Sequence, residues 1–368
     1  MNRCKIPSME VDWSQLPSEL LQLISQKLSN IELYLIRFRS VCSTWRSSSI
    51  PPNYHQNHLR LKFPRLFSKQ LFNHDIDPNI DYVTYLIKHN LFIIKPPTTQ
   101  HQHRPWLIMI GPDFQGKTQL WHPFSLRNEP LSSHFDGNVL DFNKLSVLHI
   151  GHMFYFHRST LPQNSQNTRT DCKFGVASCQ EEQPFVIVTT EKNQKPVMFR
   201  CGDDHLTTIP NMSTPCKVMN CAFKGRPCVV DSTNQTVMIG PDMSIHLMAQ
   251  ADPWYGGRRK FLVASSEFQL LDEKEKKWVK LRNLGDTILF LGDLYSFSAS
   301  ASASDLGLTN GNGVIFTTDY FASRGLSCMD RNMSVFHLDQ GRVSPLSDYP
   351  DYFKLFWPPP DWITELNS

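Results

Sequence analysis

Two adjacent prolines, Pro51 and Pro52, separate two regions of the chain that have different hydrophobic patterns. Before them, apolar residues recur mostly at spacings of three and four, which places them on one side of a helix. After them, apolar residues occur in short runs bounded by Gly, Pro, Asn, Asp or Ser, a pattern typical of β-strands joined by turns. Because proline disfavours continuation of a helix, the sequence predicts a small helical region followed by a much larger β-rich region.

The helical region contains two sets of apolar residues. The first helix is expected to begin near Pro17, since proline has no amide hydrogen and suits the first turn of a helix. Its apolar face consists of Leu20, Leu21, Ile24 and Leu28. The second set consists of Leu35, Phe38, Val41, Cys42 and Trp45. A module of about 40 residues rarely buries enough surface to be stable alone, so the bundle needs a partner protein or a larger core, and periodicity leaves both open.

Composition limits the classes of function. The chain has 368 residues, 40% of them hydrophobic, which allows about two folded domains. Its net charge of +3 is too small to indicate a nucleic-acid-binding surface. No signal peptide and no run of about 18 apolar residues occurs, so we expect neither secretion nor membrane insertion. The nine cysteines form no CxxC pair, which indicates free thiols in the nucleus or cytoplasm.

The β-rich region contains many short apolar runs. We expect strands at 91–94, 106–110, 139–142, 185–189, 197–199, 228–230, 236–239, 261–263, 278–281, 288–291, 314–317 and 335–338. Two hairpins are predicted, one joining 197–200 to 205–209 and one joining 335–338 to 342–343. About 300 residues of this kind are too many for one sandwich, whereas six or seven four-stranded blades of roughly 40 to 50 residues fit.

The predicted fold class is therefore an α+β multidomain protein. A small helical domain at 10–52 and a connector at 53–60 precede a large all-β domain at 61–362, which we expect to be a β-propeller. No WD dipeptide or kelch-type double glycine recurs, so a double sandwich remains an alternative.

Residues 111–118, Gly-Pro-Asp-Phe-Gln-Gly-Lys-Thr, satisfy the spacing of a P-loop and follow the predicted strand 106–110. A working P-loop requires a helix after its Lys-Thr pair, because the phosphates bind to the exposed amides of that helix. Here residues 117–121 alternate like a strand, and Pro123 would interrupt the second helical turn. We therefore predict a hairpin loop, with nucleotide binding as a remote alternative.

Other polar residues form no recognisable catalytic or metal site. His101 and His103 lack a third ligand nearby, and strand alternation would place His149, His152 and His157 on different faces. We therefore predict no catalytic residue, no metal and no cofactor.

Residues 10–50 resemble the F-box family. The resemblance rests on Leu16-Pro17 at the start of the first helix and on Arg37-x-Arg39-x-Val41-Cys42-x-x-Trp45-Arg46 after it. It implies binding to the Skp-type adaptor of a Skp–cullin–F-box ubiquitin ligase, and through the adaptor to a cullin. The adaptor-binding residues that it implies are Leu16, Pro17, Leu20, Leu21, Ile24, Val41 and Trp45.

The C-terminal half carries a second resemblance. Ordered motifs that include Leu284-Gly-Asp286, Gly313-Val-Ile-Phe316 and Trp357-Pro-Pro-Pro360 resemble plant F-box proteins whose C-terminal half is a domain of unknown function, also found in kinase-interacting F-box-like proteins. The resemblance implies a non-catalytic substrate receptor whose propeller binds an unidentified target protein. The alternative is a non-degradative or inhibitory interaction module, for example one that binds a kinase.

Overall fold

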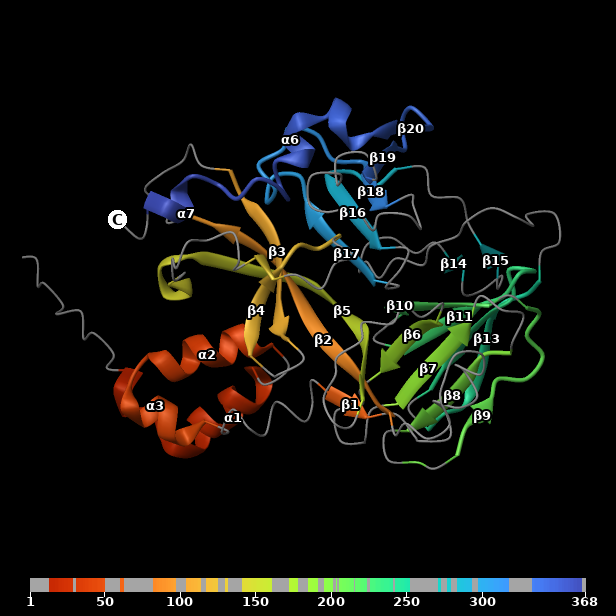
Figure 1. The fold of residues 1–368 in the computed structure, drawn as a ribbon, viewed down its shortest axis with the longest axis horizontal. Coiled ribbons are helices and arrows are strands. Elements are labelled where there is room, and N and C mark those ends of the chain that lie inside the picture. Colours follow the sequence, from red (N-terminus) through yellow and green to blue (C-terminus); the bar gives the residue numbers. More distant parts are fainter. Residues whose placement is uncertain are drawn as a thin grey trace, which may run out of the picture. The chain divides into compact units, whose positions relative to one another are not determined.

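A computed structural model of the chain describes residues 13–28, 31–49, 60–62, 82–96, 104–113, 117–124, 130–131, 141–160, 172–177, 185–190, 195–200, 203, 205–214, 216–223, 226–240, 242–251, 271–272, 277–278, 283–292, 297–317 and 333–365. The chain divides into two compact units, Met1–His58 and Leu59–Ser368. The first unit is helical and the second is built mainly of strands (Figure 1).

The helical unit contains the 3₁₀ turn η1 (Trp13–Gln15) and the helices α1 (Ser18–Leu28), α2 (Glu32–Ser40) and α3 (Ser43–Ser48). As its fixed φ predicts, Pro17 precedes α1 and its carbonyl oxygen accepts the first helical bond, from the amide of Leu21 at 3.1 Å. The helix α1 contacts both α2 and α3. The predicted short bundle is therefore present.

The second unit contains five sheets in its described part. The first has β1 (Arg60–Lys62), β2 (Tyr82–Lys95), β3 (Trp106–Pro112), β4 (Thr118–Trp121) and β5 (Ser146–Thr160). The second has β6 (Cys172–Ala177), β7 (Phe185–Thr190), β8 (Val197–Arg200) and β9 (Thr207–Thr208). The third has β10 (Lys217–Phe223), β11 (Arg226–Val230), β12 (Thr236–Ile239) and β13 (Ile245–Ala249).

A short fourth sheet pairs β14 (Leu271–Asp272) with β15 (Lys277–Trp278). The fifth has β16 (Thr287–Gly292), β17 (Phe297–Ser302), β18 (Gly313–Thr317), β19 (Met333–His337) and β20 (Arg342–Pro345). The C-terminal segment adds η6 (Leu346–Asp348), α6 (Pro350–Phe353) and α7 (Trp362–Glu365). Successive sheets, each made of strands that follow one another in the chain, agree with the predicted β-propeller.

The second and third sheets are four-stranded antiparallel meanders. Both predicted hairpins are confirmed, as β8 with β9 and β19 with β20. The turn of the second hairpin contains Gly341, whose φ of 62° is unfavourable for other residues. In the fifth sheet, β16 pairs with β18 in parallel, an arrangement that hairpin reasoning did not predict.

Some predicted strands need correction. The run 139–142 was expected to be a strand, but Phe142 lies in the 3₁₀ turn η3 (Phe142–Lys144). The cause is Asp141, whose carboxylate accepts a hydrogen bond from the amide of Asn143 at 3.0 Å and so caps the turn. The long strand β5 was not among the predicted strands, although strand alternation was assumed around His149 and His157. The run 261–263 and residues 279–281 lie outside the described residues.

One hydrophobic core joins the first and fifth sheets. Its buried residues come from β2 to β5, from β16 to β19 and from the C-terminal segment. Hydrogen bonds that fasten that segment to the start of β3 include Leu107 N to Leu355 O at 2.8 Å, Trp106 Nε1 to Phe356 O at 3.2 Å, and Trp362 Nε1 to Arg104 O at 3.0 Å. The C-terminal segment is therefore part of the folded unit. A second core joins the second and third sheets.

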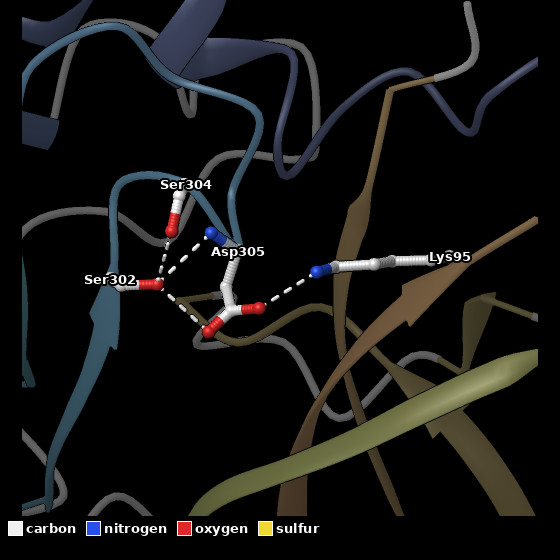
Figure 2. A network of polar contacts seen from close by, with 4 residues as sticks. All are labelled: Lys95, Ser302, Ser304 and Asp305. Carbon is white, nitrogen blue, oxygen red and sulfur yellow. Dashed lines mark hydrogen bonds and ion pairs between the residues drawn. The ribbon is translucent and has the colours of Figure 1, made fainter. Parts of the chain in front are cut away.

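A polar network also links the first and fifth sheets (Figure 2). Lys95, the last residue of β2, forms an ion pair with Asp305 at 2.8 Å, and Ser302 at the end of β17 donates to the same carboxylate at 2.8 Å. Ser302 Oγ accepts from the Asp305 amide at 3.0 Å. The Lys95 and Asp305 side chains are 33% and 42% exposed, so water screens the pair and it contributes no more than about 1 kcal/mol.

The shared core generates a stability prediction. Phe356 is fully buried and its ring contacts those of Phe124 and Phe290, with centroids 5.2 and 6.1 Å away. We expect Phe356→Ala to lower the free energy of unfolding of the β-rich unit by about 3–5 kcal/mol, measured by urea unfolding with tryptophan fluorescence. Val343→Ala, at a side chain that is 53% exposed, is the control and should change it by less than about 0.5 kcal/mol. Equal effects of the two variants would contradict the shared core.

Candidate adaptor-binding site

The helical unit exposes large apolar side chains on its first helix. Leu20, Leu23 and Ile24 are 47%, 55% and 39% exposed. Because they occupy positions i, i+3 and i+4 of α1, they share one side of it, which we call the outer face of α1. Trp13, in η1 just before the helix, is 63% exposed. Clustered exposed apolar side chains mark a surface that binds another protein.

An adjacent side of α1 is buried. Leu21 is 0% exposed and Ser25 is also buried, while Leu28 is partly buried. Positions 21, 25 and 28 share a side of the helix, about 100° away from Leu20. The family resemblance implied Leu21 as an adaptor contact, but the structure places this side chain in the interior and not on the outer face.

Trp45 fixes the position of η1, which lies just before the outer face of α1. Its indole nitrogen donates to the carbonyl oxygen of Trp13 at 3.1 Å, and its ring packs on Phe38 with a centroid distance of 4.7 Å. Phe38 is itself buried. Trp45 is only partly exposed, so in this structure it positions η1 and with it the exposed ring of Trp13.

The arginines of the motif fasten α2 to α3. Arg39 donates to the carbonyl oxygen of Arg46 at 3.2 Å and contacts the hydroxyl of Ser49. In return, Arg46 Nε donates to the carbonyl oxygen of Arg39 at 3.1 Å. These bonds to charged donors satisfy carbonyl oxygens at the ends of two short helices, which explains why this small unit carries arginines there.

The remaining residues implied by the resemblance lie at or near the surface. Pro17 is exposed, Leu16 is partly exposed, and Val41 between α2 and α3 is 57% exposed. The sequence analysis missed Trp13, Leu23 and Ile36, of which Ile36 is 47% exposed. Leu23 could have been found, since it lies three residues after Leu20 and therefore on the same side of the helix.

The P-loop-like segment is a hairpin. The strands β3 and β4 are antiparallel neighbours in register, with Pro112 opposite Thr118. Asp113 and Lys117 close the loop: the Asp113 amide donates to Lys117 O, and the Lys117 amide donates to the Asp113 carboxylate, both at 2.8 Å. A strand therefore follows Lys117 where a P-loop requires a helix, and the predicted hairpin is confirmed.

The first glycine of this segment has a packing role. A Cβ atom at Gly111 would overlap the ring of His89 and come within 2.9 Å of the Lys88 carbonyl oxygen. His89 Nε2 bonds to Pro112 O at 3.1 Å, and its ring stacks on Trp121 with centroids 4.9 Å apart. Trp121 Nε1 in turn donates to Gly111 O at 3.1 Å. The glycine therefore makes room for a buried histidine and not for a phosphate.

A serine, a histidine and an aspartate meet at the β12–β13 turn, but not as a catalytic triad. Ser244 Oγ donates to Asp242 at 2.5 Å and lies 2.7 Å from His246 Nε2. In a triad the carboxylate orients the histidine, which then takes the serine proton. Here the Asp242 carboxylate accepts the hydrogen bond of the serine hydroxyl directly, and the hydrogen bonds from Ser244 lower the pKa of Asp242. The described residues contain no cluster of three metal-ligating side chains.

Comparison with known proteins agrees with both units. A family model of the F-box domain matches residues 13–56, and one described as the KIB1-4 beta-propeller matches residues 83–337. The chain belongs to the KIB1-4 beta-propeller family. Within it, this member carries an F-box before its propeller.

Relatives from Arabidopsis thaliana match this KIB1-4 family member over nearly its whole length. "F-box protein SKIP23" is 31% identical over 407 residues, covering 96% of both chains. "F-box protein At2g17036" is 29% identical over 403 residues, covering 97% of this chain and 96% of the relative. No solved structure matches the chain significantly. None of the helices described here has the length and apolar character needed to cross a bilayer.

The role of Gly111 in this family member can be tested by substitution. Gly111→Ala should lower the stability of the β-rich unit by about 1–3 kcal/mol, because the methyl group displaces His89. The control is Gly313→Ala in β18, where the nearest atom to a new Cβ is Val335 Cγ2 at 3.6 Å, an ordinary contact. Urea unfolding followed by tryptophan fluorescence measures both variants, and a Gly111→Ala protein as stable as Gly313→Ala would refute the role.

Buried histidines predict acid sensitivity. Burial lowers the pKa of His89 to about 4, against an opposing hydrogen bond to Pro112, and lowers the pKa of His122 to about 3. The unfolded chain, with a histidine pKa of about 6.5, therefore binds more protons below pH 6.5. Stability should fall by about 1.4 kcal/mol per pH unit for each histidine as the pH drops from 6.5 towards 4. Lys88, whose pKa burial lowers to about 8, changes the stability only above about pH 7, where stability rises with pH.

Urea midpoints at pH 8, 7, 6 and 5 measure this effect. Asp305, whose pKa is lowered first by its hydrogen bond to Lys95, would lose its contribution only below about pH 4. A decline that begins near pH 6.5 therefore reports the histidines. Equal stability at pH 7.5 and pH 5 would contradict their burial as neutral groups.

Proposed function

We propose that this protein is a substrate-receptor subunit of a Skp–cullin–F-box ubiquitin ligase. The observation that carries the proposal is the exposed apolar outer face of α1, in a helical unit that matches the F-box family. This unit would bind the Skp-type adaptor, and the adaptor would connect the protein to the cullin. The propeller would bind the target protein.

The energetics of the outer face support an interaction of useful strength. Removing a leucine or isoleucine side chain from water contributes about 1.5–3 kcal/mol. Trp13 offers a large ring at a defined position, since Trp45 holds its carbonyl oxygen, and tryptophan is enriched among residues that dominate binding energy. Trp13, Leu16, Pro17, Leu20, Leu23, Ile24 and Val41 are our proposed adaptor contacts, with Trp45 as the residue that positions Trp13.

In this proposal the chain itself performs no ubiquitin chemistry. F-box family members are generally non-catalytic adaptors, and the contribution of this one would be to bring target and transfer enzyme close together in a fixed orientation. In the described part of the chain, neither Cys42 nor Cys216 forms a disulfide, which supports our proposal of a reducing compartment, the nucleus or the cytoplasm. Burial raises the pKa of Cys216 to about 12, so that thiol does not act as a nucleophile at neutral pH.

Co-purification with a Skp-type adaptor tests the proposal. We expect Leu20→Ser combined with Ile24→Ser to weaken adaptor binding at least about tenfold, since two buried apolar contacts are lost. Leu247→Ser is the matched control, because Leu247 is 39% exposed but lies on β13 of the propeller, and it should bind the adaptor normally. Failure of the intact protein to bind any Skp-type adaptor would refute the proposal.

The abundance of a bound target protein distinguishes a substrate receptor that leads to degradation from an inhibitory module that does not. A substrate receptor should lower the abundance of its target, and proteasome inhibition should restore it. The Leu20→Ser, Ile24→Ser protein should still bind the target but no longer lower its abundance. A target level that is insensitive to proteasome inhibition would instead favour non-degradative binding.

A further inference from the structure

A β-bulge brings two histidines of β5 to the same face of the first sheet. His152 lies opposite Asn90 of β2 and His149 lies opposite Phe92, while the register shifts between Leu91 and Phe92. Residues directly opposite each other in a sheet project to the same side, and Asn90 and Phe92 share a side because they are two residues apart. Strict alternation predicts that His149 and His152 lie on different faces. The extra residue of the bulge, Ile150, shifts the alternation by one residue and so places both histidines on the same face.

The same face carries a lysine and a buried amide. Lys88 lies two residues before Asn90 and opposite Phe154. Ring contacts confirm the arrangement, with His149 5.4 Å from Phe92 and His152 5.5 Å from Phe154, centroid to centroid. The opposite face of β2, which includes Leu91 and Ile93, belongs to the hydrophobic core. We call Lys88, Asn90, His149 and His152 the basic cluster.

The basic cluster has the chemistry of a site for an oxyanion. It combines one ammonium group, two imidazoles and an amide, and the strands β2, β3 and β5 contain no Asp or Glu. Asn90 is only 2% exposed, and its Oδ1 makes no hydrogen bond to any described residue. Lys88, His149 and His152 are each partly exposed, whereas Asn90 Oδ1 and His149 Nε2 lie at the buried side of the cluster.

We propose that the basic cluster binds the phosphate group of a small molecule. Lys88 and the imidazole N–H groups would donate to the phosphate oxygens, and a P–OH group would donate to Asn90 Oδ1, so that the ligand satisfies the buried amide. Arrays of groups with perturbed pKa values are common at binding sites.

Burial of the positively charged groups is consistent with this assignment. Burial lowers the pKa of Lys88 to about 8 and that of His152 to about 3, and for His152 the positive charges of Lys88 and His149 add to the effect. A bound anion would favour the protonated forms of the same groups. A negative ligand would therefore increase the positive charge of the cluster when it binds.

Titration of the full-length protein with inorganic phosphate, at pH 7 and constant ionic strength, tests the site by calorimetry. We expect saturable binding that Lys88→Met and His152→Gln each weaken at least about tenfold, the value of one lost charge-assisted hydrogen bond. Lys117→Ala is the control, because Lys117 is an exposed cation of the P-loop-like hairpin. Its phosphate affinity should equal that of the unmodified protein.

Three results would overturn the proposal: no saturable binding, binding that survives Lys88→Met, or binding that is lost in Lys117→Ala. A parallel titration with glycerol 3-phosphate distinguishes the source of the phosphate, since tighter binding of the ester indicates an organic phosphate and equal binding indicates free phosphate. Lys88→Met should bind the Skp-type adaptor normally, so failure of this site and failure of the adaptor proposal are distinguishable.

A measurement on the unmodified protein covers the case in which a variant does not fold. Acetic anhydride acetylates free amines, and mass spectrometry gives the rate at each lysine. Saturating phosphate should slow acetylation of Lys88 at least about tenfold, because a bound phosphate holds the amine in its protonated form. Lys354, which is exposed on the C-terminal segment, should react at the same rate with and without phosphate. Equal rates at Lys88 would contradict the site.

Discussion

The β-rich unit depends on the hydrophobic core that its first and last sheets share. Strands from both ends of the unit contribute to this core, and the C-terminal segment adds Leu346, Tyr352, Leu355 and Phe356. Neither sheet could bury its apolar face alone, because the residues that cover it come from about 200 positions away in the chain. The Lys95–Asp305 pair adds little energy beside this core (Figure 2), but it links the end of β2 to the turn that follows β17.

Much of this fold was predictable because strand composition is a local property. The buried runs at β3, β7, β11 and β16 were recognisable from apolar residues between turn signals, and the helical unit from spacing and prolines. The same local rules distinguished a hairpin from a P-loop at 111–118. Features that depend on distant partners were not predictable, among them the parallel pairing of β16 with β18 and the packing of His89 against Gly111.

Two side-chain assignments show where sequence periodicity reaches its limit. In α1, Leu20 and Leu21 are adjacent leucines of one motif, yet one is 47% exposed and the other 0%. Their order along the helix could not decide which side packs inward, since that depends on where α2 and α3 lie. In β5, strict alternation separated His149 from His152, and a single bulged residue reverses the conclusion. The candidate phosphate site is therefore a product of the sheet and not of any sequence motif.

The strands β16 to β19 and the C-terminal segment, which complete the shared core, are synthesised last, and this affects how the chain folds during synthesis. The helical unit is complete within the first 58 residues, whereas the apolar faces of β2 and β3 must wait on the ribosome until β16 to β19 and the C-terminal segment emerge. During that time these apolar faces are exposed and prone to aggregation. Under the proposed function, a chain truncated before Phe356 would keep its helical unit for adaptor binding but would have an incomplete β-rich unit.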